Sequence, residues 1–244
     1  MNNTAIIIPS RLAAQRLPNK PLKLINNKEM ILHVYEAAVQ SNVSEVIVAT
    51  PDKEIAETIN KIGGKAIITG EHHKTGTDRV FEVFENTLKA KPDIIINLQG
   101  DMPNINPNAI TALINYMSKN KCDIGTLASD LDPKIDYENP NVVKVTVNNK
   151  LLESSFENAL DFFRINKNLS KNVYHHIGIY GFTNHSLVRY VKLKRSKLEL
   201  ERKLEQLRAL ENDMSIHVGY INSPPLSVDT EVDLIEIKKL MKNE

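Results

Sequence analysis

The chain has 244 residues, 41% hydrophobic and 25% charged, so it is long enough for one large α/β domain or two small ones, with a substantial core. Its formal net charge is only +1, which argues against a nucleic-acid surface, since that needs basic residues spread over a face. The single Cys122 excludes an internal disulfide and a cysteine-cluster metal site.

The apolar runs are too short to cross a bilayer, and the N-terminus lacks the charged start and long apolar stretch of a secretory signal. We therefore expect a cytoplasmic protein with no membrane insertion and no nucleic-acid partner.

The first half of the chain alternates short apolar runs with amphipathic segments, the pattern of a mainly parallel sheet with helices on both faces. We predict strands over residues 5–9, 45–50, 65–69, 93–100 and 123–129. Helices are predicted over 28–41 and 77–89, where apolar residues recur at helical spacing.

The rhythm changes at Asn141, where "NVVKVTVNNKLLESSF" alternates apolar and polar residues around an Asn-Asn turn and predicts a β-hairpin. Later segments predict strands over 175–182 and 215–221 and helices over 196–212 and 231–243. No internal repeat or clear linker is present. We predict one domain over residues 1–244, containing a smaller β-rich subdomain at about 141–222.

The first candidate site segment is "PSRLAAQRLPNKPL", which carries Arg11, Arg16 and Lys20 just after the first predicted strand. Ligands of open parallel sheets bind beyond the carboxyl ends of the strands, and no acidic residue precedes Glu29. The loop contains no glycine, so side chains rather than a glycine-rich backbone must hold a phosphate. On charge alone, a solvated basic loop is equally open.

The second segment is "HHKTGTDR", in which Thr75, Gly76 and Thr77 offer hydroxyls and the free N–H groups of a helix start. These groups suit an anion or the edge of a nucleobase. The structural alternative makes Thr77 an N-cap, Gly76 a turn residue and either His72 or His73 a surface histidine.

The third segment is "NLQGDMP", where Asp101 follows a buried strand and is placed to hold Mg²⁺. Gln99 can contact a base or a sugar, although Gly-Asp is also a common turn. Asp229 is a candidate second metal ligand, but spacing does not prove that the two carboxylates meet. The neighbouring Asp233 is more simply interpreted as part of a helix-capping box, because Thr230 and Asp233 have the spacing of that motif.

Seven segments, "PSRLAAQRLPNKPL", "TGTDR", "NLQGD", "NVVKV", "HHIGIYG", "LEQLR" and "VDTEVD", occur in the order seen in the 3-deoxy-manno-octulosonate (KDO) cytidylyltransferases. The chain resembles this family over nearly its whole length, and "HHIGIYG" followed by "LEQLR" is the most specific part. The resemblance implies a three-layer α/β/α Rossmann-like nucleotidyltransferase fold, mostly parallel, with a β-rich sugar-binding and dimerisation subdomain. It also implies a Mg²⁺-dependent homodimer that converts CTP and KDO to CMP-KDO and diphosphate for lipopolysaccharide biosynthesis.

The resemblance assigns site residues one by one. Those that match the nucleotide contacts are Arg11, Arg16, Lys20, Thr75, Gly76 and Gln99; those that match the metal ligands are Asp101 and Asp229; and those that match the sugar pocket are Arg164, His176, Tyr180, Glu205 and Gln206. Lys20, Arg11 and Asp101 are the implied catalytic residues. Arg164 matches the contact to the KDO carboxylate. In the structural alternative, Glu205 and Gln206 belong to the exposed side of an amphipathic helix.

The chain departs from the family pattern at Met102, where an acid is usual, and at Asp161 and Phe163 in "ALDFFR". The connection from Arg164 to His176 is also short. Three other functions stay open at this point: a CMP-sialic acid synthetase or related activator of acidic sugars, a glycosyltransferase, and a non-catalytic nucleotide-binding protein.

Overall fold

The computed structural model describes residues 3–13, 16–132, 136–153, 155–165 and 171–242, and it divides into two compact units. Unit 1 comprises Met1–Thr111 and Pro225–Glu244, and unit 2 comprises Ala112–Pro224. The predicted subdomain at 141–222 lies inside unit 2, which also takes in the preceding strand.

Unit 1 contains a parallel sheet with the strand order β5-β4-β1-β6. Its strands are β1 (Thr4–Pro9), β4 (Glu45–Thr50), β5 (Ala66–Ile68) and β6 (Ile94–Leu98). All four agree with predicted strands to within two residues at either end. Every residue of β1 and β6 is buried, as expected for parallel strands that are covered on both faces.

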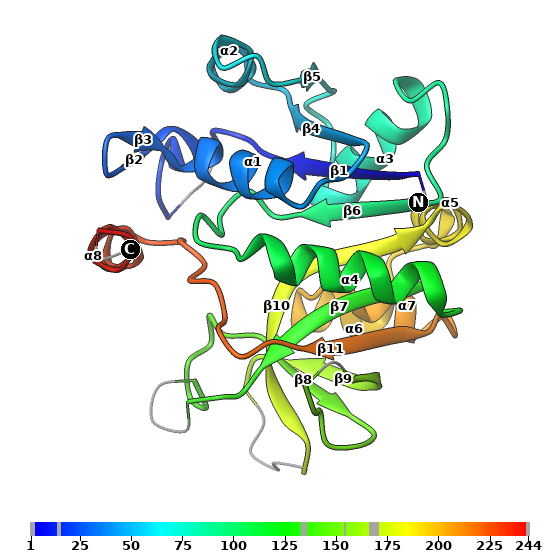
Figure 1. Cartoon of the computed structure of the whole chain (residues 1–244). Coiled ribbons are helices and arrows are strands. Elements are labelled where there is room, and N and C mark those ends of the chain that lie inside the picture. Colours follow the sequence, from blue (N-terminus) through cyan, green and yellow to red (C-terminus); the bar gives the residue numbers. More distant parts are fainter. Residues whose placement is uncertain (1–2, 14–15, 133–135, 154, 166–170, 243–244) are drawn as a thin grey trace. The chain divides into compact units, whose positions relative to one another are not determined.

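Helices cover both faces of this sheet. They are α1 (Met30–Gln40), α2 (Lys53–Lys61) and α3 (Gly76–Asn86), and α8 (Glu231–Leu240) completes the unit. The chain moves outward from β1 to β4 and β5 and then returns to β6, so right-handed crossovers place α3 on the face opposite α1. Figure 1 shows α1 in front of the strands and α3 behind them. The predicted helical stripe of α1 is buried.

Two short elements complete the description of unit 1. A 3₁₀ turn, η1 (Lys20–Leu22), precedes a hairpin of β2 (Leu24–Ile25) and β3 (Lys28–Glu29). Helix α4 (Pro107–Lys119) begins in unit 1 and continues into unit 2.

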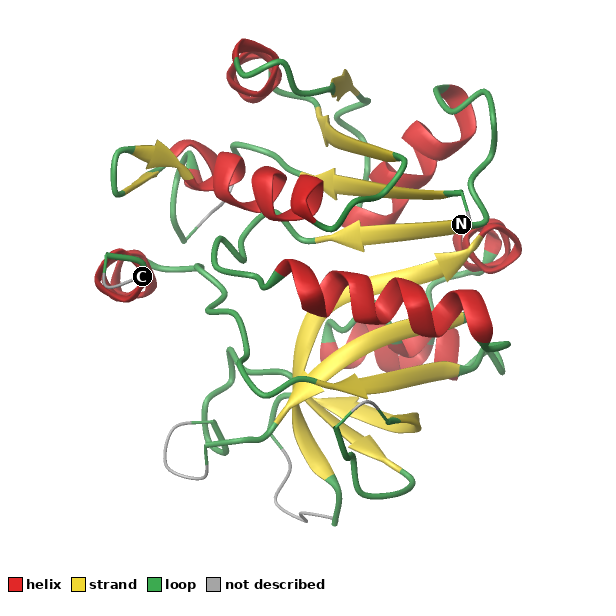
Figure 2. Ribbon diagram, in the orientation of Figure 1, coloured by secondary structure: helices red, strands yellow, loops and turns green. Residues whose placement is uncertain are grey.

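Unit 2 is the β-rich part of the chain (Figure 2). Its strands are β7 (Ile124–Ser129), β8 (Lys144–Val147), β9 (Phe156–Phe163), β10 (Val173–Thr183) and β11 (Ile216–Tyr220). β7 pairs in parallel with β11, whereas the other described pairings of this unit are antiparallel. β8 pairs with both β9 and β10, so the five strands form a closed circuit of pairings.

The predicted hairpin at Asn141 is confirmed as β8 and β9, but the returning strand begins at Phe156, well beyond the Asn-Asn turn. The predicted single helix over 196–212 is wrong. It is two short helices, α6 (Lys197–Arg202) and α7 (Leu207–Leu210), because Lys203 adopts a left-handed backbone with φ of 54°. A third helix of this unit, α5 (Asn184–Lys192), follows β10.

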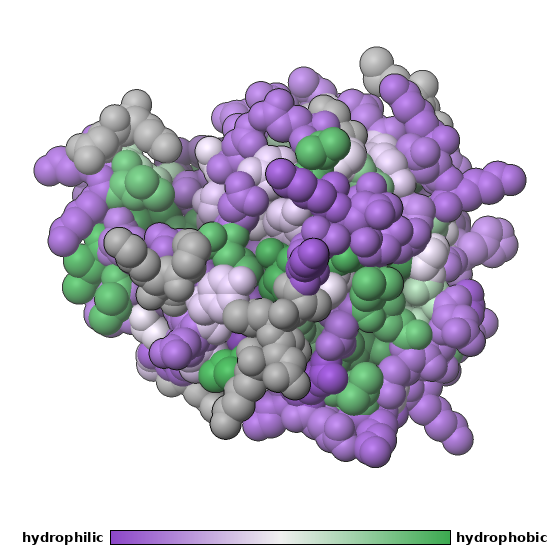
Figure 3. All heavy atoms as spheres, turned by 90° about the horizontal axis from the view of Figure 1, so that it is seen from below, coloured by the Kyte–Doolittle hydropathy of each residue, from purple (hydrophilic) through white to green (hydrophobic). Residues whose placement is uncertain are grey.

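The face shown in Figure 3 is mainly hydrophilic, with apolar side chains in separate groups. Large exposed apolar side chains of unit 2 include Leu152, Leu160 and Ile165, which are 58% to 60% exposed. They belong to the predicted dimerisation subdomain, and the dimer stays a prediction. Of the helices in the described ranges, none is long and apolar enough to cross a membrane.

Candidate functional site

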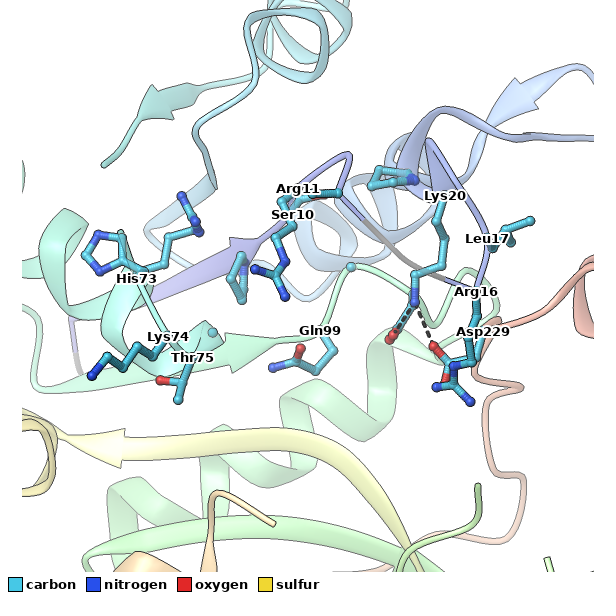
Figure 4. Close-up of a pocket in the computed structure, with 17 residues that line it drawn as sticks. Ser10, Arg11, Arg16, Leu17, Lys20, His73, Lys74, Thr75, Gln99 and Asp229 are labelled. Atoms are coloured by element: carbon cyan, nitrogen blue, oxygen red, sulfur yellow. Dashed lines mark hydrogen bonds and ion pairs between the residues drawn. The ribbon is translucent and has the colours of Figure 1, made fainter. Parts of the chain in front are cut away.

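Unit 1 contains a cavity of about 680 Å³ at the carboxyl ends of β1 and β6. The segment after β1, the start of α3, the segment after β6 and Asp229 before α8 supply its walls (Figure 4). All of the predicted nucleotide and metal residues line this one cavity: Arg11, Arg16, Lys20, Thr75, Gly76, Gln99, Asp101 and Asp229. The structure therefore brings together four segments that are distant in sequence.

A backbone contact brings Asp229 next to Asp101. The N–H of Val228 donates to the carbonyl of Asp101 at 2.9 Å, so the residue that follows Val228 is held at the end of β6. Val228 is fully buried in an apolar cluster with Leu17, Met30 and Leu234. Burial of α8 thus fixes one carboxylate of the site, and burial of Leu17 fixes the loop that carries Lys20.

Lys20, Asp101 and Asp229 form an ion-pair cluster that we call the Lys20 clasp. The Nζ of Lys20 lies 2.9 Å from Asp101 Oδ2 and 2.9 Å from Asp229 Oδ1, and the three side chains are 15%, 24% and 32% exposed. Burial lowers the pKa of Lys20, but the two carboxylates more than offset this and leave that pKa raised. Lys20 is therefore a stable cation in the free protein.

The clasp corrects one expectation. The early basic loop lacks acidic neighbours in sequence, which suggests that its counter-charge arrives only with a ligand. In the structure, Asp101 and Asp229 already neutralise Lys20, and Arg16 donates to the other oxygen of Asp229 at 2.9 Å. The sequence alone did not predict this ion pair, because Lys20 and Asp229 are 209 residues apart.

The same geometry answers whether the two predicted metal ligands meet. Because both carboxylates contact one ammonium nitrogen, their oxygens converge on a single cation position. Within the described part of the chain, no group of three or more His, Cys, Asp or Glu side chains forms a metal site. Two carboxylates suit Mg²⁺ bound together with phosphate oxygens and water, so the donor set fits that ion only when a phosphate ligand is present.

Arg11 projects into the cavity from the end of β1 (Figure 4). The loop that carries it is anchored at its start, because Ser10 N donates to Ala49 O at 2.9 Å and Leu12 N donates to Asp52 Oδ2 at 2.8 Å. Arg11 is exposed and forms no ion pair with any residue that the structure describes. Its guanidinium is therefore available to an anionic ligand.

The start of α3 forms another wall. Thr75, not Thr77, is the N-cap, and its hydroxyl accepts from Asp78 N at 3.1 Å while the Asp78 carboxylate accepts from Thr75 N at 3.2 Å. A Cβ on Gly76 would lie 3.3 Å from Pro9 Cγ and 3.4 Å from Gln99 Nε2. Glycine thus lets the helix start come close to Pro9 and Gln99, where a Cβ would be crowded.

Gln99 is held by a buried chain of hydrogen bonds. Its Nε2 donates to Asn97 Oδ1 at 3.1 Å, and Asn97 Nδ2 donates to Thr77 Oγ1 at 3.1 Å. Because the amide nitrogen is engaged by Asn97, the carbonyl oxygen of Gln99 is left for a ligand. Met102, at the position where the family usually has an acid, is buried and provides no oxygen ligand.

Sequence reasoning missed four polar residues of this cavity: Ser10, His73, Lys74 and Arg79. The expected surface histidine is His72, which is exposed, whereas the His73 side chain is 10% exposed and pairs with Glu82. Arg79 closes the "TGTDR" segment, so its place in that motif was the available signal. Five Lys or Arg side chains and two Asp side chains line the cavity, a formal excess of three positive charges that suits a polyanion.

The predicted sugar-side residues all belong to unit 2. His176 and Tyr180 lie on β10, where a register shift between Ile177 and Tyr180 separates their pairings with β7. Their ring centroids are 5.4 Å apart. Burial raises the pKa of Tyr180, the charge of Glu205 raises it further, and the charge of Arg164 opposes both. Tyr180 is therefore close to three of the other four residues: the ring of His176 and the charges of Glu205 and Arg164.

Arg164 follows β9, and its Nη1 donates to the carbonyls of Pro140 at 2.8 Å and Asn141 at 3.2 Å. Lys144 supports the same region from β8: its buried Nζ donates to the carbonyls of Asn139, Val142 and Arg164 at 2.6 to 3.0 Å. This explains the lysine of "NVVKV", which satisfies all three of its N–H groups on backbone oxygens. Part of the short connection to His176 lies outside the described residues.

Glu205 and Gln206 precede α7, and Gln206 is buried rather than on an exposed helix side. Their position depends on Arg208, which forms a bidentate pair with Glu199 at 2.7 and 2.8 Å and lies 4.7 Å from the Tyr190 ring centroid. Both charged side chains of that pair are almost fully buried. Burial raises the pKa of Glu199, but interactions led by the paired Arg208 guanidinium outweigh burial and leave that pKa lowered.

We expect Glu199→Gln to lower the free energy of unfolding by about 3 kcal/mol, because it leaves the buried Arg208 guanidinium without its counter-ion. Urea denaturation measures this directly. Glu201→Gln is the matched control, since Glu201 lies on the same helix but is exposed, and it should change stability by no more than about 0.5 kcal/mol. Equal effects of the two changes would contradict the role of the buried pair.

His176 makes stability depend on pH. Burial, with a smaller contribution from His175, lowers its pKa from 6.5 to about 3. Between these values the unfolded chain binds a proton that the folded protein does not, so the free energy of unfolding falls as pH drops below 6.5. Urea denaturation above and below pH 6.5 should show that the free energy of unfolding depends less steeply on pH in His176→Gln than in the wild type. An unchanged slope would contradict this, and the exposed His185→Gln serves as control.

Comparisons with known proteins extend the picture. The cytidylyltransferase family model matches residues 5–216. The 3-deoxy-manno-octulosonate cytidylyltransferase of Thermodesulfovibrio yellowstonii is 40% identical, over 98% of each chain. A solved structure of CMP:2-keto-3-deoxy-manno-octonic acid synthetase complexed with CTP is 36% identical, covers 98% of each chain and has a TM-score of 0.88.

A nucleotidyl transferase from Methanothermobacter thermautotroptrophicus shares the fold alone, with a TM-score of 0.65, 14% identity and full coverage of both chains. These likenesses confirm the predicted Rossmann-like nucleotidyltransferase fold. The family match and the identity over nearly the whole chain together show that the protein belongs to the cytidylyltransferase family, among the 3-deoxy-manno-octulosonate cytidylyltransferases.

Proposed function

We propose that the protein transfers a cytidylyl group from CTP to KDO, forming CMP-KDO and diphosphate. One observation carries the proposal: the cationic cavity of unit 1 gathers every predicted nucleotide residue, in a chain similar over 98% of its length to a synthetase solved with CTP. The early basic loop supports a free nucleoside triphosphate as substrate. The relatives do not favour the sialic-acid, glycosyltransferase or non-catalytic alternatives.

The triphosphate is expected to lie against the cations of the cavity. Arg11 and Arg16 present planar guanidiniums, which clamp phosphate oxygens bidentately, while Lys20 presents a point charge. The cytosine is expected to lie in the cavity against the wall formed by Gly76 and Gln99, where the carbonyl oxygen of Gln99 accepts a hydrogen bond. An exocyclic amino group, which cytosine has and uracil lacks, is the matching donor.

Mg²⁺ is part of the proposal, with Asp101 and Asp229 as its protein ligands. When bound, the ion neutralises phosphate charge and lowers the pKa of a coordinated hydroxyl, so a dedicated general base is unnecessary. The other contributions come from the chain itself. Nucleotidyl transfer depends mainly on positioning and charge stabilisation, and the cavity supplies fixed cations for both.

The reaction has one bond-forming and one bond-breaking event. The anomeric oxygen of KDO bonds to the α-phosphorus, the α–β phosphoanhydride breaks, diphosphate leaves with the electron pair, and the hydroxyl proton passes to solvent. Lys20 stabilises the charge that develops on the α-phosphoryl group, and Arg11 and Arg16 hold the phosphates in line.

Unit 2 is proposed to bind the sugar. Arg164 is expected to contact the KDO carboxylate, and His176, Tyr180, Glu205 and Gln206 its hydroxyls, since a polar, partly buried set of donors and acceptors suits such a ligand. We further propose a cytoplasmic homodimer, joined through unit 2, that serves lipopolysaccharide biosynthesis.

The test is diphosphate release from CTP. We expect release with KDO and Mg²⁺, little with N-acetylneuraminate, and none without a sugar acceptor. Replacing CTP by UTP tests the base contact. Release with N-acetylneuraminate but not with KDO would transfer the assignment to a sialic-acid activator, and no release with either sugar would refute a sugar-activating enzyme.

A further inference from the structure

Arg79 is a buried cation in the wall of the nucleotide cavity. It lies on α3 and is only 4% exposed, yet it lines the same cavity as Arg11. Lysine and arginine are almost never this buried unless a carboxylate pairs with them. Arg79 forms no ion pair with a residue of the described ranges, so it has no direct counter-ion in the free protein.

The hydrogen bonds of Arg79 use one end of its guanidinium. Nη1 donates to Thr69 Oγ1 and, at 3.1 Å, to the carbonyl of Gly70. A guanidinium has five N–H groups, so Nε and Nη2 retain donors that no described residue accepts from. Burial lowers the pKa of Arg79, and the neighbouring charge of Arg11, which itself has no described ion-pair partner, lowers it further. The carboxylates of Asp52 and Glu82 oppose this without contacting the guanidinium and do not outweigh it.

Arg79 also holds the loop between β5 and α3, the segment that leads into the helix start at the cavity. Glu82, one turn later on the same helix, holds the loop from the same side: Gly70 N donates to its Oε2 at 3.0 Å, and its carboxylate pairs with His73. Thr75 and Gly76 follow directly after these anchored residues. The helix that begins at the cavity thus fixes its own entry loop.

We propose that Arg79 is a further nucleotide-site residue, which positions the Thr69–Thr75 loop through Nη1 and contributes its charge, which has no direct ion-pair partner among the described residues, to binding of the triphosphate. The inference rests on the proposed function. Two adjacent cations without described counter-ions repel each other, and a bound polyanion turns that repulsion into attraction. A purely structural arginine accounts for the Thr69 and Gly70 bonds, but not for an unpaired charge placed next to Arg11 in the cavity.

The test compares Arg79→Met, Arg79→Lys and Thr69→Val by calorimetric titration with CTP at low and high salt. Arg79→Met should raise the Kd for CTP about tenfold or more at low salt and flatten its salt dependence. Arg79→Lys keeps the charge and should recover part of the affinity and the salt dependence. Thr69→Val removes one acceptor and should weaken binding while leaving the salt dependence unchanged.

The controls separate this inference from the proposed function. Wild-type protein that does not bind CTP refutes the function itself, whereas the variants test Arg79. Lys61→Met, an exposed cation change in the same unit, should leave CTP binding unaltered. A folded Arg79→Met protein with wild-type affinity at both salt concentrations overturns the inference. Where Arg79→Met fails to fold in thermal unfolding, wild-type CTP binding by both Arg79→Lys and Thr69→Val overturns it instead.

Discussion

Lys20→Ala is expected to lower turnover about 100- to 1,000-fold, the loss typical of removing one preorganised charge from the transition state of a group transfer. The ammonium lies between two carboxylates in the wall of the cationic cavity, a position that Lys74, the other lysine of this wall, does not occupy. Diphosphate release under saturating CTP and KDO measures the effect. The KM for KDO should change little, because the sugar residues belong to unit 2.

The same change is expected to cost stability as well. Without Lys20, Asp101 and Asp229 face each other, and the ion pair of Arg16 with Asp229 compensates them in part. We expect the free energy of unfolding to fall by about 1 kcal/mol, discounted for partial exposure. Unfolding curves of the variant therefore accompany the kinetics. Lys61→Ala, on the exposed end of α2, is the control for both measurements. Near-normal turnover of a folded Lys20→Ala protein would refute the central catalytic role.

Local patterns predicted the parallel half of the molecule well, because buried parallel strands are continuous apolar runs and the helices between them have clear stripes. These patterns failed to predict the point at which one residue with a left-handed backbone ends a helix. Residues 196–212 have good helical periodicity, but the left-handed Lys203 turns the chain so that Leu204 and Leu207 are buried while Leu200 is exposed. Only that break lets Glu199 reach Arg208.

The candidate site was predictable as a set of residue types but not as a charge network. Each segment could be found because it follows a strand, where ligands of parallel sheets bind. Pairing partners could not be found, since a 2.9 Å contact between Lys20 and Asp229 depends on how α8 packs against the loop of Leu17. Arg79 was not predicted for a related reason. A charged side chain is notable when it is buried, and the sequence alone does not show which charged side chains are buried.

Asp101→Asn is expected to reduce turnover about 100-fold or more, because an amide is a far weaker ligand for Mg²⁺ than a carboxylate. The change keeps the shape of the side chain, so the fold should be retained. Asp93→Asn is a matched control: Asp93 immediately precedes β6, whereas Asp101 follows its other end, and it is exposed and accepts a hydrogen bond from Asn3 N. Diphosphate release and thermal unfolding of both variants separate catalysis from stability.

Metal binding gives a second measurement that does not depend on turnover. In the free protein Lys20 already occupies the position on which Asp101 and Asp229 converge, so a divalent ion has to displace the ammonium. Mn²⁺, followed by electron paramagnetic resonance, should therefore bind wild-type protein weakly without CTP and more tightly with CTP, whose phosphates offer Lys20 a new partner. Lys20→Ala should bind Mn²⁺ more tightly than wild type without nucleotide, and Asp101→Asn should lose the CTP-dependent gain. Equal Mn²⁺ binding by free wild-type and Lys20→Ala proteins would mean that the Lys20 clasp does not compete with the metal.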